Sequence, residues 1–179
     1  MPRYVAFLRA INVGGHTVKN TELKKIFAAA GIADAETFIA SGNVIFESKS
    51  RSEPALTGKI EGAMEKTLGY EVRTFLRGVE ELTEVGEQTP FKPARHKSAK
   101  AYVIGFVESP FTAAEKKTFA TFAGPNDEFH VDGREAYWLS QTFQSESPVF
   151  KIPVEKRVGR LMTWRNINTV QRIVAKYSG

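Results

Sequence analysis

Apolar residues in the first half of the chain follow two spacings, one typical of strands and one typical of helices. Four short apolar or aromatic runs predict strands: residues 3–10, 35–40, 43–48 and 71–78. Between them, residues 20–30 and 52–69 carry apolar side chains three and four positions apart, which predicts two helices. The resulting order, strand, helix, strand, strand, helix, strand, is the ferredoxin-like split motif.

Residues that favour helix ends and turns support this assignment. Asn20 is the predicted N-cap of the first helix, and Gly31 is its predicted stop. Ser52 caps the second helix, and Gly69 ends it. Ser41-Gly42 joins the second and third strands in a tight hairpin.

The second half of the chain begins with the same order of elements. It is predicted to hold strands at 100–107, 127–133 and 135–140, a helix near 112–123, and helical segments after residue 152. Pro90 and Pro93 mark a boundary before it. We therefore predict an α+β protein of two ferredoxin-like plaits, one over residues 1–90 and a second, plait-like subdomain with C-terminal helices over 91–179.

Alternation along the first and fourth strands places different side chains on the two faces of the first sheet. Phe7, Arg9, Phe75 and Arg77 share the face opposite the two helices. Arginines mixed with aromatics on an open sheet are typical of a surface that stacks nucleic-acid bases. The alternative is that this face is covered and its arginines lie at the rim.

Composition narrows the class of protein. Hydrophobic residues make up 42% of the 179 residues, and no apolar run approaches the length that spans a bilayer. The absence of cysteine excludes disulfides and favours a cytoplasmic location without membrane association. The net charge is +5, yet residues 151–179 hold seven basic residues against Glu155, a net +6. This cluster is either a solvated cationic helix or a surface that attracts phosphates.

Three polar stretches are the candidate site, because none of them suits a hydrophobic core. Their candidate ligand-binding residues are Arg9, Asn12, Gly14, Gly15, Ser41, Gly42, Asn43, Arg165, Asn166, Asn168 and Thr169. Glycines between a strand and a helix let backbone N–H groups face an anion, although neither a dinucleotide nor a P-loop motif is present. Thr163 or Asn166 is the expected cap of the last helix, which leaves Arg165 and Asn168 as donors for phosphate, carboxylate or base recognition.

The three histidines of the sequence show no spacing typical of a metal site, and no cofactor is expected. His16 follows the double glycine and is a candidate proton shuttle if a site forms there. Ser41 lacks the surroundings of a nucleophile elbow.

These stretches together resemble a bacterial family known as domain of unknown function 1697. The resemblance rests on LRAINVGG (8–15), VKNTELKKIF (18–27), FIASGNVIFES (38–48) and TWRNINTV (163–170). Ala10 stands where the family usually has glycine, Trp164 where threonine is more usual, and Ile167 where tryptophan is usual. The resemblance implies a two-part fold of ferredoxin-like plaits and directs attention to the polar residues above, but it implies no activity.

The predicted strand order 4-1-3-2 brings the end of the first strand beside the start of the third, so Arg9 and Asn43 should be close. We also expect the start of the last helix to join them. Three functions follow from such a cluster. It binds an anionic small molecule or nucleic acid, it is an enzyme site that positions a phosphate- or carboxylate-bearing substrate, or it is a structural network or protein-interaction surface.

Overall fold

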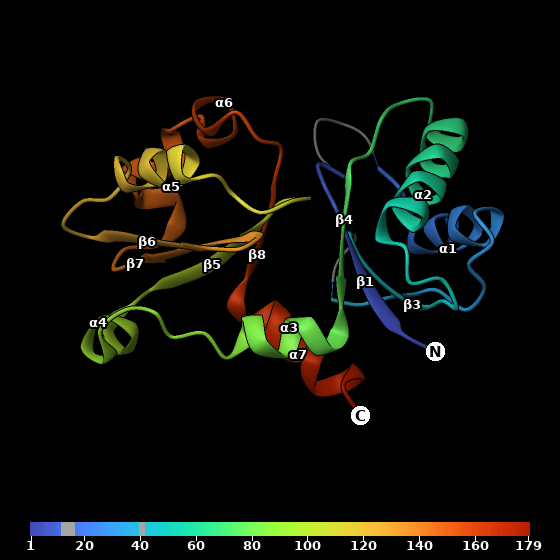
Figure 1. Cartoon of the computed structure of the whole chain (residues 1–179), viewed down its shortest axis with the longest axis horizontal. Coiled ribbons are helices and arrows are strands. Elements are labelled where there is room, and N and C mark those ends of the chain that lie inside the picture. Colours follow the sequence, from blue (N-terminus) through green and yellow to red (C-terminus); the bar gives the residue numbers. More distant parts are fainter. Residues whose placement is uncertain (12–16, 40–41) are drawn as a thin grey trace. The chain divides into compact units, whose positions relative to one another are not determined.

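The computed structural model describes residues 1–11, 17–39 and 42–179. The chain forms two compact units, one of Met1–Thr83 with Ile173–Gly179 and one of Glu84–Arg172. Each unit contains one four-stranded antiparallel sheet with helices (Figure 1), which confirms the predicted α+β pair of ferredoxin-like plaits. These units are defined by the proximity of residues in space. The division into domains at 1–90 and 91–179 therefore stays a prediction.

The first sheet has the predicted strand order. β1 (Arg3–Leu8) lies between β3 (Asn43–Glu47) and β4 (Thr74–Gly78), and β2 (Glu36–Thr37) pairs with β3. All three pairings are antiparallel. Because Phe7 pairs with Asn43, the end of β1 lies beside the start of β3, as the topology predicts.

Two helices cover one face of this sheet, α1 (Asn20–Ala29) and α2 (Glu53–Leu68) (Figure 1). The Ser52 hydroxyl accepts a hydrogen bond from the Ala55 N–H at 3.3 Å, which confirms the predicted cap of α2. The prediction for α1 is wrong by one residue. Its N-cap is Lys19, whose side chain makes no capping bond, and Asn20 is already helical.

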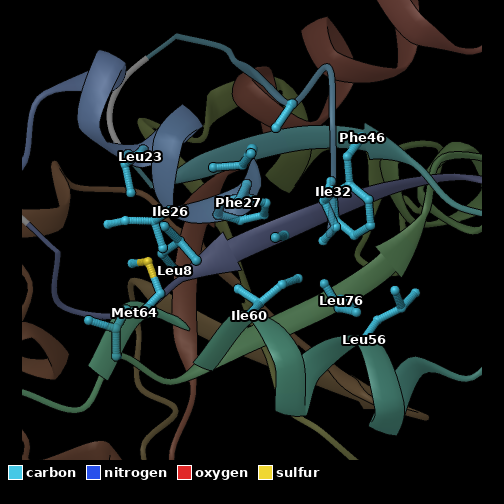
Figure 2. Packing of buried hydrophobic residues seen from close by; sticks show 14 of the residues in the cluster. Leu8, Leu23, Ile26, Phe27, Ile32, Phe46, Leu56, Ile60, Met64 and Leu76 are labelled. Carbon is cyan, nitrogen blue, oxygen red and sulfur yellow. The ribbon is translucent and has the colours of Figure 1, made fainter. Parts of the chain in front are cut away.

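The core of the first unit fills the space between these helices and the sheet (Figure 2). Helix residues at three- and four-residue spacing meet strand residues at alternate positions, as the two periodicities require. The largest contributors are Leu8, Leu23, Ile26, Phe27, Phe46, Leu56, Ile60, Met64 and Leu76. Burial of each such side chain contributes about 1.5–3 kcal/mol, which makes this cluster the main source of stability in the unit.

The opposite face of the first sheet is also buried. Val5, Phe7 and Arg77 are 0% exposed, and Phe75 is 2% exposed. The Arg77 guanidinium donates to the Leu76 carbonyl at 2.8 Å and lies 3.7 Å from the Glu81 carboxylate. Rings inaccessible to solvent cannot stack on bases, so these residues offer no base-stacking platform. The alternative of a covered face is confirmed for Phe7 and Phe75, but its expected rim position is wrong for Arg77, which is fully buried.

The last residues of the chain pack on the first unit. Arg3 Nη1 donates to the Tyr177 carbonyl at 2.6 Å, and Lys176 Nζ lies 2.7 Å from the Glu36 carboxylate. The hydrogen bond from Lys176 lowers the pKa of Glu36, and the same bond raises the pKa of Lys176. Both side chains of this pair are exposed, so its contribution to stability is small.

The second sheet repeats the topology of the first. β5 (Ala101–Phe106) is central, flanked by β7 (Glu135–Ser140) and β8 (Thr163–Asn166), and β6 (Asp127–Asp132) pairs with β7. The order β6-β7-β5-β8 corresponds strand for strand to β2-β3-β1-β4. The sequence did not predict β8, because its four residues include three polar side chains and read as the approach to a helix.

The remaining elements connect or cover the strands. α3 (Val79–Gly86) and α4 (Pro93–Ser98) precede β5, and a Thr112–Glu115 capping box opens α5 (Ala113–Ala120). The later segments are η1 (Gln144–Glu146), η2 (Pro148–Lys151), α6 (Val154–Val158) and α7 (Ile167–Tyr177). In α7, Val170, Ile173 and Tyr177 are buried, while Ile167 and Val174 are partly buried.

Two contacts fix the second sheet and the segment that follows it. Gly105 pairs with Trp164, and a Cβ added to Gly105 would lie 3.0 Å from the indole ring. The buried Asp127 carboxylate accepts hydrogen bonds from Trp138 Nε1 and Ser147 Oγ, both at 2.8 Å. The same Ser147 hydroxyl accepts from the Val149 N–H at 3.1 Å, so one carboxylate ties η2 to the sheet.

Replacement of Ala10 by glycine should stabilise the protein. Ala10 has φ 56°, a left-handed conformation that costs a residue with a Cβ about 1–2 kcal/mol. Glycine removes this cost but gains backbone entropy in the unfolded chain, so Ala10→Gly should raise the free energy of unfolding by about 0.5–1 kcal/mol. Urea denaturation of the variant and the wild type measures this change in the free energy of unfolding. Ala28→Gly, at an exposed helical position of α1, is the matched control and should lower the free energy of unfolding.

Replacement of Asp127 by alanine should lower the free energy of unfolding by roughly 3 kcal/mol, because two buried donors lose their acceptor. Ser147→Ala removes one donor and leaves the carboxylate bonded to Trp138, so its cost should be about 1 kcal/mol. Chemical denaturation of the two variants measures both values. Equal losses would contradict the central role given to the carboxylate.

Candidate functional site

The first polar stretch begins where β1 ends. The Leu8 N–H donates to the Gly42 carbonyl at 2.8 Å, and the Arg9 N–H donates to the Arg73 carbonyl at 2.9 Å. Arg9 is therefore fixed by its backbone beside the start of β3 and the residues before β4, and its side chain is partly exposed. Four candidate residues of the first two stretches, and the candidate proton shuttle, lie outside the described residues: Asn12, Gly14, Gly15, Ser41 and His16.

Gly42 and Asn43 of the second stretch shape the loop before β3. Gly42 has φ 105°, a conformation that favours glycine. Asn43 is 3% exposed, and its Nδ2 donates to the Phe38 carbonyl at 3.2 Å. The Phe38 N–H in turn donates to the Asn43 carbonyl at 3.1 Å. These bonds close the loop between β2 and β3, which accounts for the asparagine without a ligand.

Arg165 of the third stretch lies on β8, opposite Ile104 of β5. Its Nη1 donates to the Thr163 hydroxyl at 2.7 Å and to the Trp164 carbonyl at 2.9 Å. These bonds hold the guanidinium in one orientation against the sheet. Burial lowers the pKa of Arg165 to about 10, which means that its surroundings disfavour the positive charge.

The start of α7 holds the other candidate residues of this stretch. Asn166 Oδ1 accepts a hydrogen bond from the Asn168 N–H at 2.9 Å, which confirms Asn166 as the predicted cap. The side chain of Asn168 is exposed, and that of Thr169 is partly buried. Asn168 and Thr169 thus lie in the first turn of the helix, where the helix dipole favours negative charge.

The structure brings together the described candidates within each unit. Arg9, Gly42 and Asn43 meet where the end of β1 lies beside the start of β3, as predicted. Arg165 and Asn166 meet at the junction of β8 with α7. The convergence of all three stretches on one cleft stays a prediction.

The positive charge of residues 151–179 is partly neutralised. Arg160 Nη1 lies 3.1 Å from a Glu115 carboxylate oxygen, and its Nη2 donates to the Ser109 carbonyl at 2.7 Å. Burial acts to raise the pKa of Glu115, but hydrogen bonds from Thr112 and the charge of Arg160 outweigh it and lower the pKa. Lys176 likewise pairs with Glu36, so carboxylates neutralise both Arg160 and Lys176.

An aromatic cluster was missed by sequence reasoning, which treated the histidines as scattered. On the second unit, the His96 ring lies 5.2 Å from that of Tyr102, and the His130 ring lies 6.0 Å from that of Tyr137. His96 Nε2 accepts a hydrogen bond from the Phe91 N–H at 3.2 Å. The sequence signal available for this cluster was the alternation of side chains along β5, which places Tyr102 on one face of the strand. Burial raises the pKa of Tyr102, whose hydroxyl donates to the Gln88 carbonyl at 2.7 Å.

Among residues 1–11, 17–39 and 42–179, no group of three His, Cys, Asp or Glu side chains is placed to hold a metal ion. Within the same ranges, no helix has the length and apolar character needed to cross a membrane.

The fold and these polar residues define a class of α+β proteins built from two ferredoxin-like plaits. Residues 1–137 match the model of the family described as "Protein of unknown function (DUF1697)", and the chain belongs to that family. A conserved bacterial protein, SP0830 from Streptococcus pneumoniae, has a similar structure, with a TM-score of 0.77 and 20% sequence identity. That similarity covers 100% of this chain and 99% of the other, and it shows the fold alone. No curated protein matches the sequence.

Replacement of Asn166 by alanine should lower the free energy of unfolding by about 1 kcal/mol, because the first turn of α7 loses its cap. Asn168→Ala is the matched control. Its exposed side chain should be replaceable within about 0.5 kcal/mol, although the sequence offers both asparagines as ligand-binding residues. Thermal and urea denaturation of the two variants measures the difference. An equal loss in both would contradict the assignment of the cap.

Proposed function

We propose that this is a cytoplasmic protein that binds an anionic ligand, with Arg165 as its principal cation. The ligand classes that fit are a nucleotide, another phosphorylated metabolite or nucleic acid. The observation that carries the proposal is the guanidinium of Arg165. It is held by Thr163 and Trp164 in a place where burial lowers its pKa to about 10. A guanidinium that is already held in one orientation loses little conformational entropy when an anion binds to its donors.

The surroundings of Arg165 support the same ligand chemistry. Asn166 caps α7, so the positive end of the helix dipole lies at this junction. The planar guanidinium presents its donors in a fork that matches phosphate and carboxylate oxygens. Asn168 and Thr169 add an exposed amide and a hydroxyl near the same helix turn.

Arg9 with the residues that follow it, and Ser41 with Gly42 and Asn43, are included in the proposal as sequence-based candidates. The bonds of Asn43 already serve the loop before β3, so we expect its replacement to affect stability more than binding. Arg9→Met tests the first stretch, because it removes a partly exposed cation and leaves the backbone bond to Arg73 in place.

Thermal denaturation with phosphate, pyrophosphate or ATP tests the proposal. A ligand that binds only the folded state stabilises it by about 2.7 kcal/mol at one hundred times its Kd, so Tm should rise with ligand concentration. Potassium chloride at equal ionic strength controls for general salt effects. The proposal is wrong if none of the three anions raises Tm above this control.

Replacement of Arg165 by methionine separates binding from folding. Methionine keeps an apolar stem and removes the guanidinium, so Arg165→Met should leave the free energy of unfolding of the ligand-free protein within about 1 kcal/mol of the wild-type value. The same variant should lose the anion-dependent rise in Tm. Arg157→Met, at an exposed position of α6, makes the same change in net charge and should keep that rise. A large loss of stability in Arg165→Met would instead favour a structural role.

A further inference from the structure

Two phenylalanine rings of the second unit lie in solvent within one short segment. Phe143 is 56% exposed and Phe150 is 59% exposed. Elsewhere in the described residues, the large hydrophobic side chains that are exposed are Met1 and Leu161, which lie singly. We call residues 143–151, which include η1 and η2, the aromatic ridge.

The exposure of these rings does not come from a loose segment. Ser147 Oγ donates to the buried Asp127 carboxylate at 2.8 Å, and Ser147 is 1% exposed. Val149 is 3% exposed and packs with Val103 and Trp138. Two positions of the ridge, Ser147 and Val149, are thus anchored against the sheet, while Phe143 and Phe150 are exposed. Rings held in this way lose little conformational entropy when they bind a ligand.

Lysines lie beside both rings. Lys100 Nζ is 5.1 Å from the centre of the Phe143 ring, and the exposed Lys151 directly follows Phe150. α4 joins the start of the ridge, because Gln141 Nε2 donates to the Arg95 carbonyl at 3.0 Å and the Ser98 hydroxyl donates to Gln141 Oε1. α4 and its N-cap carry two further exposed lysines, Lys92 and Lys97.

We propose that the aromatic ridge binds single-stranded nucleic acid, with bases stacked on Phe143 and Phe150 and phosphates neutralised by Lys100 and Lys151. Exposed rings accept the faces of unpaired bases, and nearby cations follow the backbone, which is how proteins bind single strands without sequence preference. Lys92, Lys97, Lys100 and Lys151, against Glu146, give this surface the charge complementary to a phosphate backbone. An apolar protein partner would leave these lysines unpaired at its interface.

This surface is distinct from the proposed Arg165 site. The ridge packs against Val103, whereas Arg165 pairs with Ile104, and consecutive strand residues face opposite sides of a sheet. The two proposals can therefore fail separately.

Fluorescence anisotropy with a labelled oligothymidylate and oligouridylate of about 12 nucleotides tests the proposal. Phe143→Ala and Phe150→Ala should each weaken binding by about tenfold. Leu161→Ala, which removes a similarly exposed apolar side chain elsewhere, should leave the affinity unchanged. Between about 50 and 200 mM NaCl, the slope of log affinity against log salt should be shallower by about 1.4 in Lys100→Gln/Lys151→Gln, because each phosphate contact contributes about 0.7.

The outcomes distinguish the alternatives. Absence of binding at low salt, or equal affinities of wild type and both phenylalanine variants, overturns the proposal. A dimer that sedimentation detects in wild type and not in Phe143→Ala identifies the ridge as a self-association surface, and also overturns it. The tenfold loss caused by Phe143→Ala should be the same in the Arg165→Met background, while the phenylalanine variants should keep any rise in Tm with phosphate, pyrophosphate or ATP.

Discussion

The structure depends on one strand in each sheet that is paired on both sides. β1 makes antiparallel pairs with β3 and β4, and its residues from Val5 to Leu8 are at most 1% exposed. A strand with both edges bonded and both faces covered has a single register that satisfies its backbone and its side chains. The register of β1 also positions Arg9 at its end, where the Arg9 N–H donates to the Arg73 carbonyl.

Much of this arrangement could be predicted, because local patterns of apolar and polar residues determine the strands and helices. Alternating apolar residues and helical spacing predicted the elements of the first plait. The predicted cap at Ser52 is confirmed, and of the two candidates for the last cap, Thr163 and Asn166, the structure has Asn166. β8 was missed because a four-residue strand is defined by its partner β5 rather than by its own composition. The cap of α1 was misplaced because Lys19 has no capping side chain that a sequence pattern could reveal.

The candidate site was predicted only in part, for a related physical reason. Sequence identifies a polar residue that does not suit a core, but not the bond that it makes. Asn43 proved to close its own loop, and Asn166 proved to cap its own helix. Arg165 differs, since its bonds orient a charge that burial disfavours. The exposed rings of the aromatic ridge could not be foreseen either, because phenylalanine is usually buried and its exposure depends on tertiary packing.

The close approach of Gly105 to Trp164 has a consequence for the evolution of the second sheet. The indole occupies the volume in which a side chain at position 105 would lie, so the two positions share one fixed space across the β5–β8 pair. A homologue with a small residue at position 164 has room for a side chain at 105, and one with a bulky ring does not. The two positions should therefore vary in a compensating manner, with their summed side-chain volume conserved among homologues while neither residue is conserved alone.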